Sequence, residues 1–124
     1  MNRRFAALIA MIVLIGVVLA GVLYVTPKPP PATEKSFVLV IKDNALASGP
    51  SVMTVNQDDT VTLRVQSDRG GHLMVHGYEK ELEVGGGGEA TLTFVANKSG
   101  RFDVHLHGAN EEHIELATIE VQPR

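Results

Sequence analysis

The sequence predicts an all-β sandwich or barrel that follows one apolar helix of membrane-spanning length. Two observations support this fold class. An uncharged apolar run lies near the N-terminus, and after it come short segments in which apolar and polar residues alternate between turn-forming residues. Alternation with a period of two indicates strands with one buried face, and short strands at close intervals favour a sandwich or barrel.

The apolar run extends over 21 residues, from Phe5 to Val25. As a helix it would rise roughly 30 Å, the thickness of the hydrocarbon core. Arg3 and Arg4 precede it and should stay cytoplasmic, which predicts a single-pass protein of the cell membrane with its C-terminal domain on the periplasmic or extracellular side. The alternative is a secretory signal that is cleaved after Ala20. The apolar run is longer than the apolar core of a typical secretory signal, which favours the anchor. Both alternatives export the domain.

Three regions are predicted. Residues 1–25 form a membrane anchor or signal segment, which meets the lipid bilayer through residues 5–25. Residues 26–35 contain four prolines and form a stiff linker. Residues 36–124 form one β-domain, because the remaining chain is too short for a second core.

Five segments of this domain carry the strand pattern most clearly: Phe37–Ile41, Val61–Val65, Thr91–Phe94, Phe102–Leu106 and Ile119–Val121. The acidic residues of 79–83 alternate with Lys80 and Leu82, which is typical of the outer face of an edge strand. The four glycines of 85–88 predict a loop. They do not predict a phosphate cradle, because a strand follows them where a phosphate loop needs a helix.

Charge and cysteine content exclude several classes of function. From Thr33 onward the chain has eight Lys and Arg against fourteen Asp and Glu, a formal charge of −6. This excess disfavours a nucleic-acid partner. The chain has no cysteine, so it has no disulfide, no thiolate metal ligand and no lipid-modified cysteine.

All five histidines lie in two short clusters of the β-domain: His72, His76, His105, His107 and His113. Imidazole is the commonest metal ligand in proteins. His105 and His107 are two apart on a predicted strand and share the face away from its apolar residues. His72 and His76 also share one face, and His113 follows a turn at the start of the last strand. These five residues are the predicted metal ligands, and no catalytic residue is predicted.

Each feature also has a simpler interpretation. His72 and His105 could be solvated polar residues on the wet face of a sheet. Met53 and Met74 are predicted to be gap-filling core residues rather than soft ligands. The glutamates of 111–112 could orient ligands, but a charged pair in a loop usually faces solvent.

The order of these features resembles the cupredoxin family. The resemblance rests on MTVNQDDTVTLRVQSD, a histidine in the following loop, TLTFVANKSGRFDV and the final HIELATIEV, which together cover roughly residues 52–122. The family includes plastocyanin-like proteins and the periplasmic domain of cytochrome oxidase subunit II. The resemblance implies a Greek-key β-sandwich and a copper site.

In that family copper is held by a histidine, a cysteine, a second histidine and often a methionine. His72 is similar to the first histidine, with His76 as a rival. The cysteine position corresponds to Leu106 or, by a second alignment, to His107. His113 resembles the later histidine.

The methionine position corresponds to Leu116, so two of the family's ligands are missing. A thiolate-based copper centre for electron transfer therefore cannot form. An all-imidazole site would favour Cu(II) or Zn(II), with copper as the expected metal and zinc as the second choice.

Three functions follow. The leading hypothesis is a membrane-tethered, exported cupredoxin-like domain that binds copper through histidines for metal handling and is not an enzyme. The second is a metal-free domain that serves a membrane-protein partner as a structural or docking module. The third is a zinc enzyme with three histidine ligands, which is disfavoured because no substrate pocket is predicted.

Overall fold

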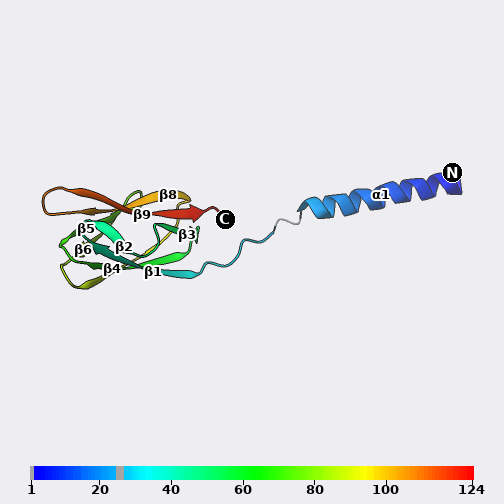
Figure 1. Ribbon diagram of the computed structural model, residues 1–124. Coiled ribbons are helices and arrows are strands. Elements are labelled where there is room, and N and C mark those ends of the chain that lie inside the picture. Colours follow the sequence, from blue (N-terminus) through cyan, green and yellow to red (C-terminus); the bar gives the residue numbers. More distant parts are fainter. Residues whose placement is uncertain (1, 25–26) are drawn as a thin grey trace. The chain divides into compact units, whose positions relative to one another are not determined.

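The computed structural model describes residues 2–24 and 27–124 (Figure 1). The described chain divides into an N-terminal part that ends at Pro30 and a β-domain that extends from Pro31 to Arg124. The predicted boundary between anchor and linker, at residues 25 and 26, lies outside the described residues.

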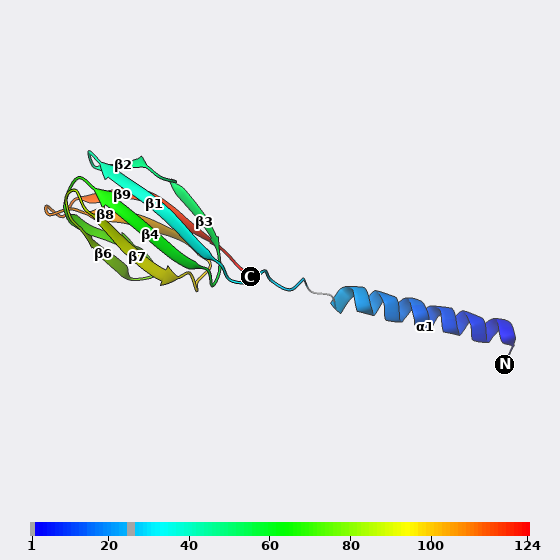
Figure 2. The ribbon, with the colours of Figure 1, turned by 90° about the horizontal axis from the view of Figure 1, so that it is seen from below.

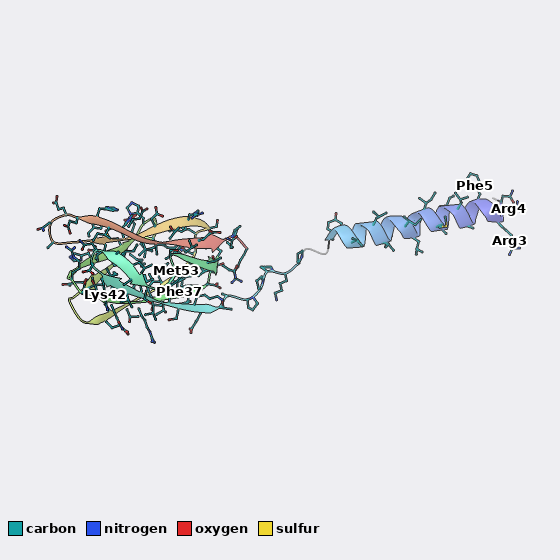
Figure 3. All side chains as sticks on the ribbon, viewed as in Figure 1. Arg3, Arg4, Phe5, Phe37, Lys42 and Met53 are labelled. Atoms are coloured by element: carbon teal, nitrogen blue, oxygen red, sulfur yellow. The ribbon has the colours of Figure 1, made fainter. Side chains whose placement is uncertain are left out.

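The N-terminal part contains the helix α1, Arg3–Tyr24, with 22 residues. Its described side chains are exposed, and Arg3, Arg4 and Phe5 mark its first turn in Figure 3. The helix is long and apolar enough to cross a membrane, a property that a secretory signal near the N-terminus would share. The predicted apolar helix is therefore confirmed, and it supports single-pass anchoring.

The β-domain has nine strands: β1 Glu34–Lys42, β2 Ala45–Ser48, β3 Val52–Asn56, β4 Thr60–Ser67, β5 Gly71–Val75, β6 Lys80–Val84, β7 Glu89–Val95, β8 Gly100–His107 and β9 His113–Gln122. They form two sheets, in the orders β2-β1-β4-β7 and β3-β9-β8-β5-β6. The pairs β1/β4 and β3/β9 are parallel, and the other pairs are antiparallel. Figure 2 shows β1, β4 and β7 side by side in one layer.

Alternation along the strands explains this architecture. On β4, Val61, Leu63 and Val65 are fully buried between the sheets, whereas Arg64 is exposed. Each of the five predicted segments lies within a strand, and β6 is an edge strand as predicted. Met53, labelled in Figure 3, is fully buried and is confirmed as a core residue. The all-β sandwich is therefore confirmed.

The entry and exit of the β-domain are joined by one buried carboxylate. Asp59, in the β3–β4 turn, has no exposed surface. It accepts hydrogen bonds from the Thr33 amide at 2.8 Å, the Asn56 amide at 2.9 Å and Arg124 Nη2 at 2.8 Å. Strand β1 begins at Glu34, two residues before the predicted start of the domain, because Thr33 is already fixed by Asp59. In both ribbon views the C-terminus and the start of β1 lie at the same end of the β-domain (Figures 1 and 2).

Candidate metal-binding site

The outer face of the five-stranded sheet carries the histidines. Strands β5 and β8 pair so that His72 is opposite His107 and Met74 is opposite His105. Strands β8 and β9 pair so that His107 is opposite His113. Directly opposite residues point to the same face of a sheet, and the residues between these positions on β5 and β8 are fully buried in the core.

Four histidines form one group, which we call the histidine cluster: His76, His105, His107 and His113. His105 is at its centre. Its Nε2 is 3.1 Å from His76 Nδ1, and its Nδ1 is 3.0 Å from His113 Nε2. Although it lies on the outer face, His105 is only 6% exposed. The interpretation of His105 as a solvated residue is therefore wrong, because its neighbours cover it.

His107 is the fourth member of the cluster. Its ring centroid is 4.7 Å from that of His113 and 6.0 Å from that of His105. Its Nε2 is buried and has no hydrogen-bond partner among the described residues. An unpaired buried polar atom is costly, so this nitrogen is a candidate for a further bonding partner.

A β-bulge brings His113 to the outer face. The partner of Val104 is Ala117, but the partner of the next residue, His105, is Glu115. The extra residue, Leu116, is buried together with Ala117. If the alternation of β9 continued unbroken from Val121 back to His113, His113 would face the core. The bulge shifts this alternation by one residue, so His113 faces outward. The sequence carries only a weak signal for this, two consecutive apolar residues within an alternating strand.

His72 lies apart from the cluster. Its Nδ1 is 2.8 Å from Glu81 Oε1 on β6, and both side chains are about half exposed. Although His72 is opposite His107 in register, its ring is directed to the carboxylate of the edge strand. The structure thus groups four of the five predicted ligands and leaves the fifth in an ion-pair position.

Met74 does not lie in the core, and its interpretation as a gap-filling core residue is wrong. Its strand neighbours Leu73 and Val75 are the buried residues, whereas Met74 is partly exposed on the outer face. The alternation that puts His72 and His76 on one face puts Met74 there as well, so the signal was present in the sequence.

The protonation of the cluster follows from its geometry. Burial lowers the pKa of His105 below its ordinary value, and charges on His113 and His76 lower it further, against the opposing effect of Asp103. His105 is therefore neutral at neutral pH, the form in which imidazole binds metals. A neutral imidazole has one donor and one acceptor nitrogen. His105 therefore donates a hydrogen bond to one of its two neighbours and accepts one from the other.

The loop that leads into His113 is held by Arg69. Its Nη2 is 2.8 Å from Glu112 Oε2 in the β8–β9 loop, and its Nη1 donates a hydrogen bond to Asn44 in the β1–β2 turn. Within the same loop, the Gly108 amide donates to the Glu112 carbonyl at 3.0 Å. The glutamates of 111–112 are exposed, and one of them thus fixes the loop instead of a histidine.

We expect Arg69→Ala to loosen this loop without unfolding the domain. A partly exposed ion pair contributes up to about 1 kcal/mol, so amide hydrogen exchange in residues 108–112 should accelerate up to about fivefold. Hydrogen-exchange mass spectrometry would measure this change. Arg101→Ala, which removes the exposed contact with Glu120 elsewhere on β8, is the matched control. Equal exchange in both variants would contradict the assigned role.

The family's thiolate copper centre does not fit this chain. Leu106, at one of the two aligned cysteine positions, is fully buried in the core, and Leu116, at the methionine position, is 7% exposed. Among the residues that the structure describes, no three His, Cys, Asp or Glu side chains form a group that could hold a metal ion. The two nitrogen pairs around His105 are separated by 3.1 and 3.0 Å, which is a hydrogen-bond distance and also a separation that two ligands of one ion can have. Two ligands at about 2.0–2.1 Å from one ion lie roughly 2.8–3.4 Å apart.

Comparisons with known proteins identify the fold. No protein-family model and no curated protein sequence matches this chain. One chain of a heme-copper terminal oxidase dimer superposes with a TM-score of 0.60 at 13% identity, over 98% of this chain and 100% of that one.

Two further structures are similar over the β-domain. Auracyanin A, a blue copper protein from the green thermophilic photosynthetic bacterium Chloroflexus aurantiacus, gives a TM-score of 0.57 at 14% identity, over 72% of this chain and 99% of that one. A copper-containing nitrite reductase from Thermus scotoductus gives 0.55 at 14% identity, over 76% of this chain and 28% of that one. The predicted cupredoxin-like fold is therefore confirmed.

Proposed function

We propose that this protein is a membrane-tethered, exported cupredoxin-like domain that binds one copper ion through the histidine cluster and holds or transfers the metal. The observation that carries the proposal is the pair of nitrogen contacts made by His105, at 3.0 and 3.1 Å. Four imidazoles are in contact on one sheet face, and one of them has a buried nitrogen without a hydrogen-bond partner among the described residues.

The geometry favours one ion for the whole cluster. His105 directs Nε2 toward His76 and Nδ1 toward His113. A neutral imidazole has only one free lone pair, so an ion on one side leaves the other nitrogen protonated and hydrogen-bonded. That hydrogen bond would orient His105, as outer-shell partners of metal ligands commonly do.

Copper is the proposed metal, and transfer is the proposed role. Imidazole sites generally bind Cu(II) more tightly than Zn(II). His76 and His113 are exposed, so a donor or acceptor of the metal can reach the cluster. Fast electron transfer is not proposed, because the chain has no thiolate. The position of Arg3 and Arg4 in the first turn of α1, ahead of its uncharged apolar run, supports the export of the β-domain.

Copper uptake by the full chain in detergent, without a polyhistidine tag, tests the proposal. Wild-type protein to which Cu(II) is added should take up about one equivalent of copper. Its electron paramagnetic resonance spectrum should show couplings to nitrogen. The exposed double variant His76→Asn/His113→Asn should bind at least about 100-fold more weakly, since loss of one orienting partner alone costs about 10- to 100-fold. His72→Asn, outside the cluster, is the matched control and should bind as wild type. Undiminished uptake by the double variant would overturn the proposal.

A second function is supported by different observations. Leu106, one of the two aligned cysteine positions, and Leu116, the methionine position, are apolar and buried, and the match to a chain of a heme-copper terminal oxidase dimer covers both α1 and the β-domain. A metal-free structural or docking subunit of a membrane complex would have both properties. Absence of copper uptake by the wild-type chain at micromolar concentrations would favour this function.

A further inference from the structure

We propose that Met74 is a thioether ligand of the copper site and that the ion retained there is Cu(I). The inference rests on the proposed copper binding of the histidine cluster, to which it adds a ligand and an oxidation state. Met74 occupies none of the positions that correspond to the copper ligands of the family.

The sheet register places Met74 beside the first nitrogen pair of the cluster. It is directly opposite His105 on β8, and His76, which contacts His105, follows directly after the end of its strand β5. Directly opposite side chains have Cβ atoms about 4.5–5.5 Å apart and point to the same face of the sheet. Methionine has three rotatable bonds, so its sulfur can reach the nitrogen pair.

A copper ion held by His76 and His105 lacks a third ligand among the histidines and carboxylates around them. His76 Nδ1 and His105 Nε2 supply two nitrogens, and among the described residues no third His, Cys, Asp or Glu completes such a group. Glu81, opposite Met74 on β6, is in contact with His72 instead. The register leaves Met74, opposite His105, as the residue whose side chain can supply the third donor.

The charge of this ligand set selects the oxidation state. Two neutral imidazoles and a thioether carry no negative charge, and His105 is buried. An uncompensated charge is costly to bury, and a divalent ion costs more than a monovalent one. Soft thioether ligands also prefer Cu(I). The set therefore suits Cu(I) better than Cu(II) or Zn(II), which favour additional nitrogen or oxygen ligands.

The experiment compares Met74→Leu with Met53→Leu in the full chain in detergent, under nitrogen. Both variants remove one sulfur and keep an apolar side chain, but Met53 is fully buried in the core away from the cluster. Competition with a chromophoric Cu(I) chelator should show a dissociation constant raised about tenfold or more for Met74→Leu, and unchanged for Met53→Leu. X-ray absorption of the Cu(I) protein should show sulfur scattering that only Met74→Leu abolishes.

The possible outcomes separate this inference from the proposed function. Wild-type Cu(I) affinity in Met74→Leu, or a copper spectrum with no sulfur scattering in the wild type, would overturn the role of Met74. If Met74 proved not to be a ligand but copper binding still required His76, the proposed function would remain intact. If the wild-type chain bound copper in neither oxidation state, the proposed function itself would fail, and this inference with it. An equal loss of affinity in both methionine variants would also contradict the assignment.

Discussion

Replacing Asp59 with Asn should lower the free energy of unfolding of the β-domain by about 3 kcal/mol. The carboxylate is fully buried and bonds to Thr33, Asn56 and Arg124, whose side chain is 12% exposed. Removing one partner of a buried ion pair costs about 3–5 kcal/mol, because the other charge loses its compensation. For a domain of this size the melting temperature should fall by at least about 12 °C.

The same carboxylate predicts a pH dependence. Burial raises the pKa of Asp59, but hydrogen bonds from Thr33 and Asn56 and the charge of Arg124 outweigh it, so the pKa lies below its ordinary value of 3.8. A group whose pKa is lowered in the folded state stabilises the fold above its unfolded pKa. That contribution is lost as the pH falls below 3.8 and through the lowered folded value. The stability difference between wild type and Asp59→Asn should therefore shrink on acidification.

Thermal unfolding followed by circular dichroism, at neutral pH and at stepwise lower pH, would measure both effects. The matched control is Asp58→Asn, which makes the same change at the neighbouring exposed residue and should alter stability by less than about 0.5 kcal/mol. If Asp59→Asn were as stable as this control, the carboxylate would not join the two ends of the domain as described.

Replacing Leu106 with Ala should destabilise the β-domain by about 2–5 kcal/mol. Leu106 is fully buried and lies opposite Leu73 on β5 and Ile114 on β9. Its truncation removes apolar surface from the core and leaves a cavity. The hydrogen bonds between strands hold the two sheets in place, so the sheets can only partly close this cavity. Equilibrium unfolding in denaturant would measure the change.

The control for Leu106 is Val95→Ala, because Val95 is 50% exposed on the edge strand β7. That variant should change stability by less than about 1 kcal/mol. A wild-type-like stability of Leu106→Ala would mean that this position is not part of the core. The alignment of Leu106 with a ligand position of the family would then need to be reconsidered.

Strand phase was the part of the fold that could be predicted most directly. Val61, Leu63 and Val65 alternate with polar residues, and this local pattern sufficed to find β4 and to say which of its faces is buried. Strands β2 and β3 were not individually predicted, because β2 has only four residues and alternation over so short a span is weak. The pairing of β1 with the distant β4 also has no local signal.

The candidate site was predictable only in part. The phase of β8 placed His105 and His107 on the outer face, as the structure confirms. The bulge at Leu116, which turns His113 to the same face, depends on how β9 pairs with β8 and has no reliable signature in one strand alone. The separation of His72 depends on Glu81, which lies on the neighbouring edge strand.

The sequence by itself determined the class of fold, the apolar helix and the face of each clear strand, because these depend on the period of residues close together in the chain. Only the tertiary structure decided that His105 is buried, that it contacts His76 and His113, and that Met74 lies beside it. Burial and contact depend on the register between strands, and register is set by pairing among segments far apart in sequence.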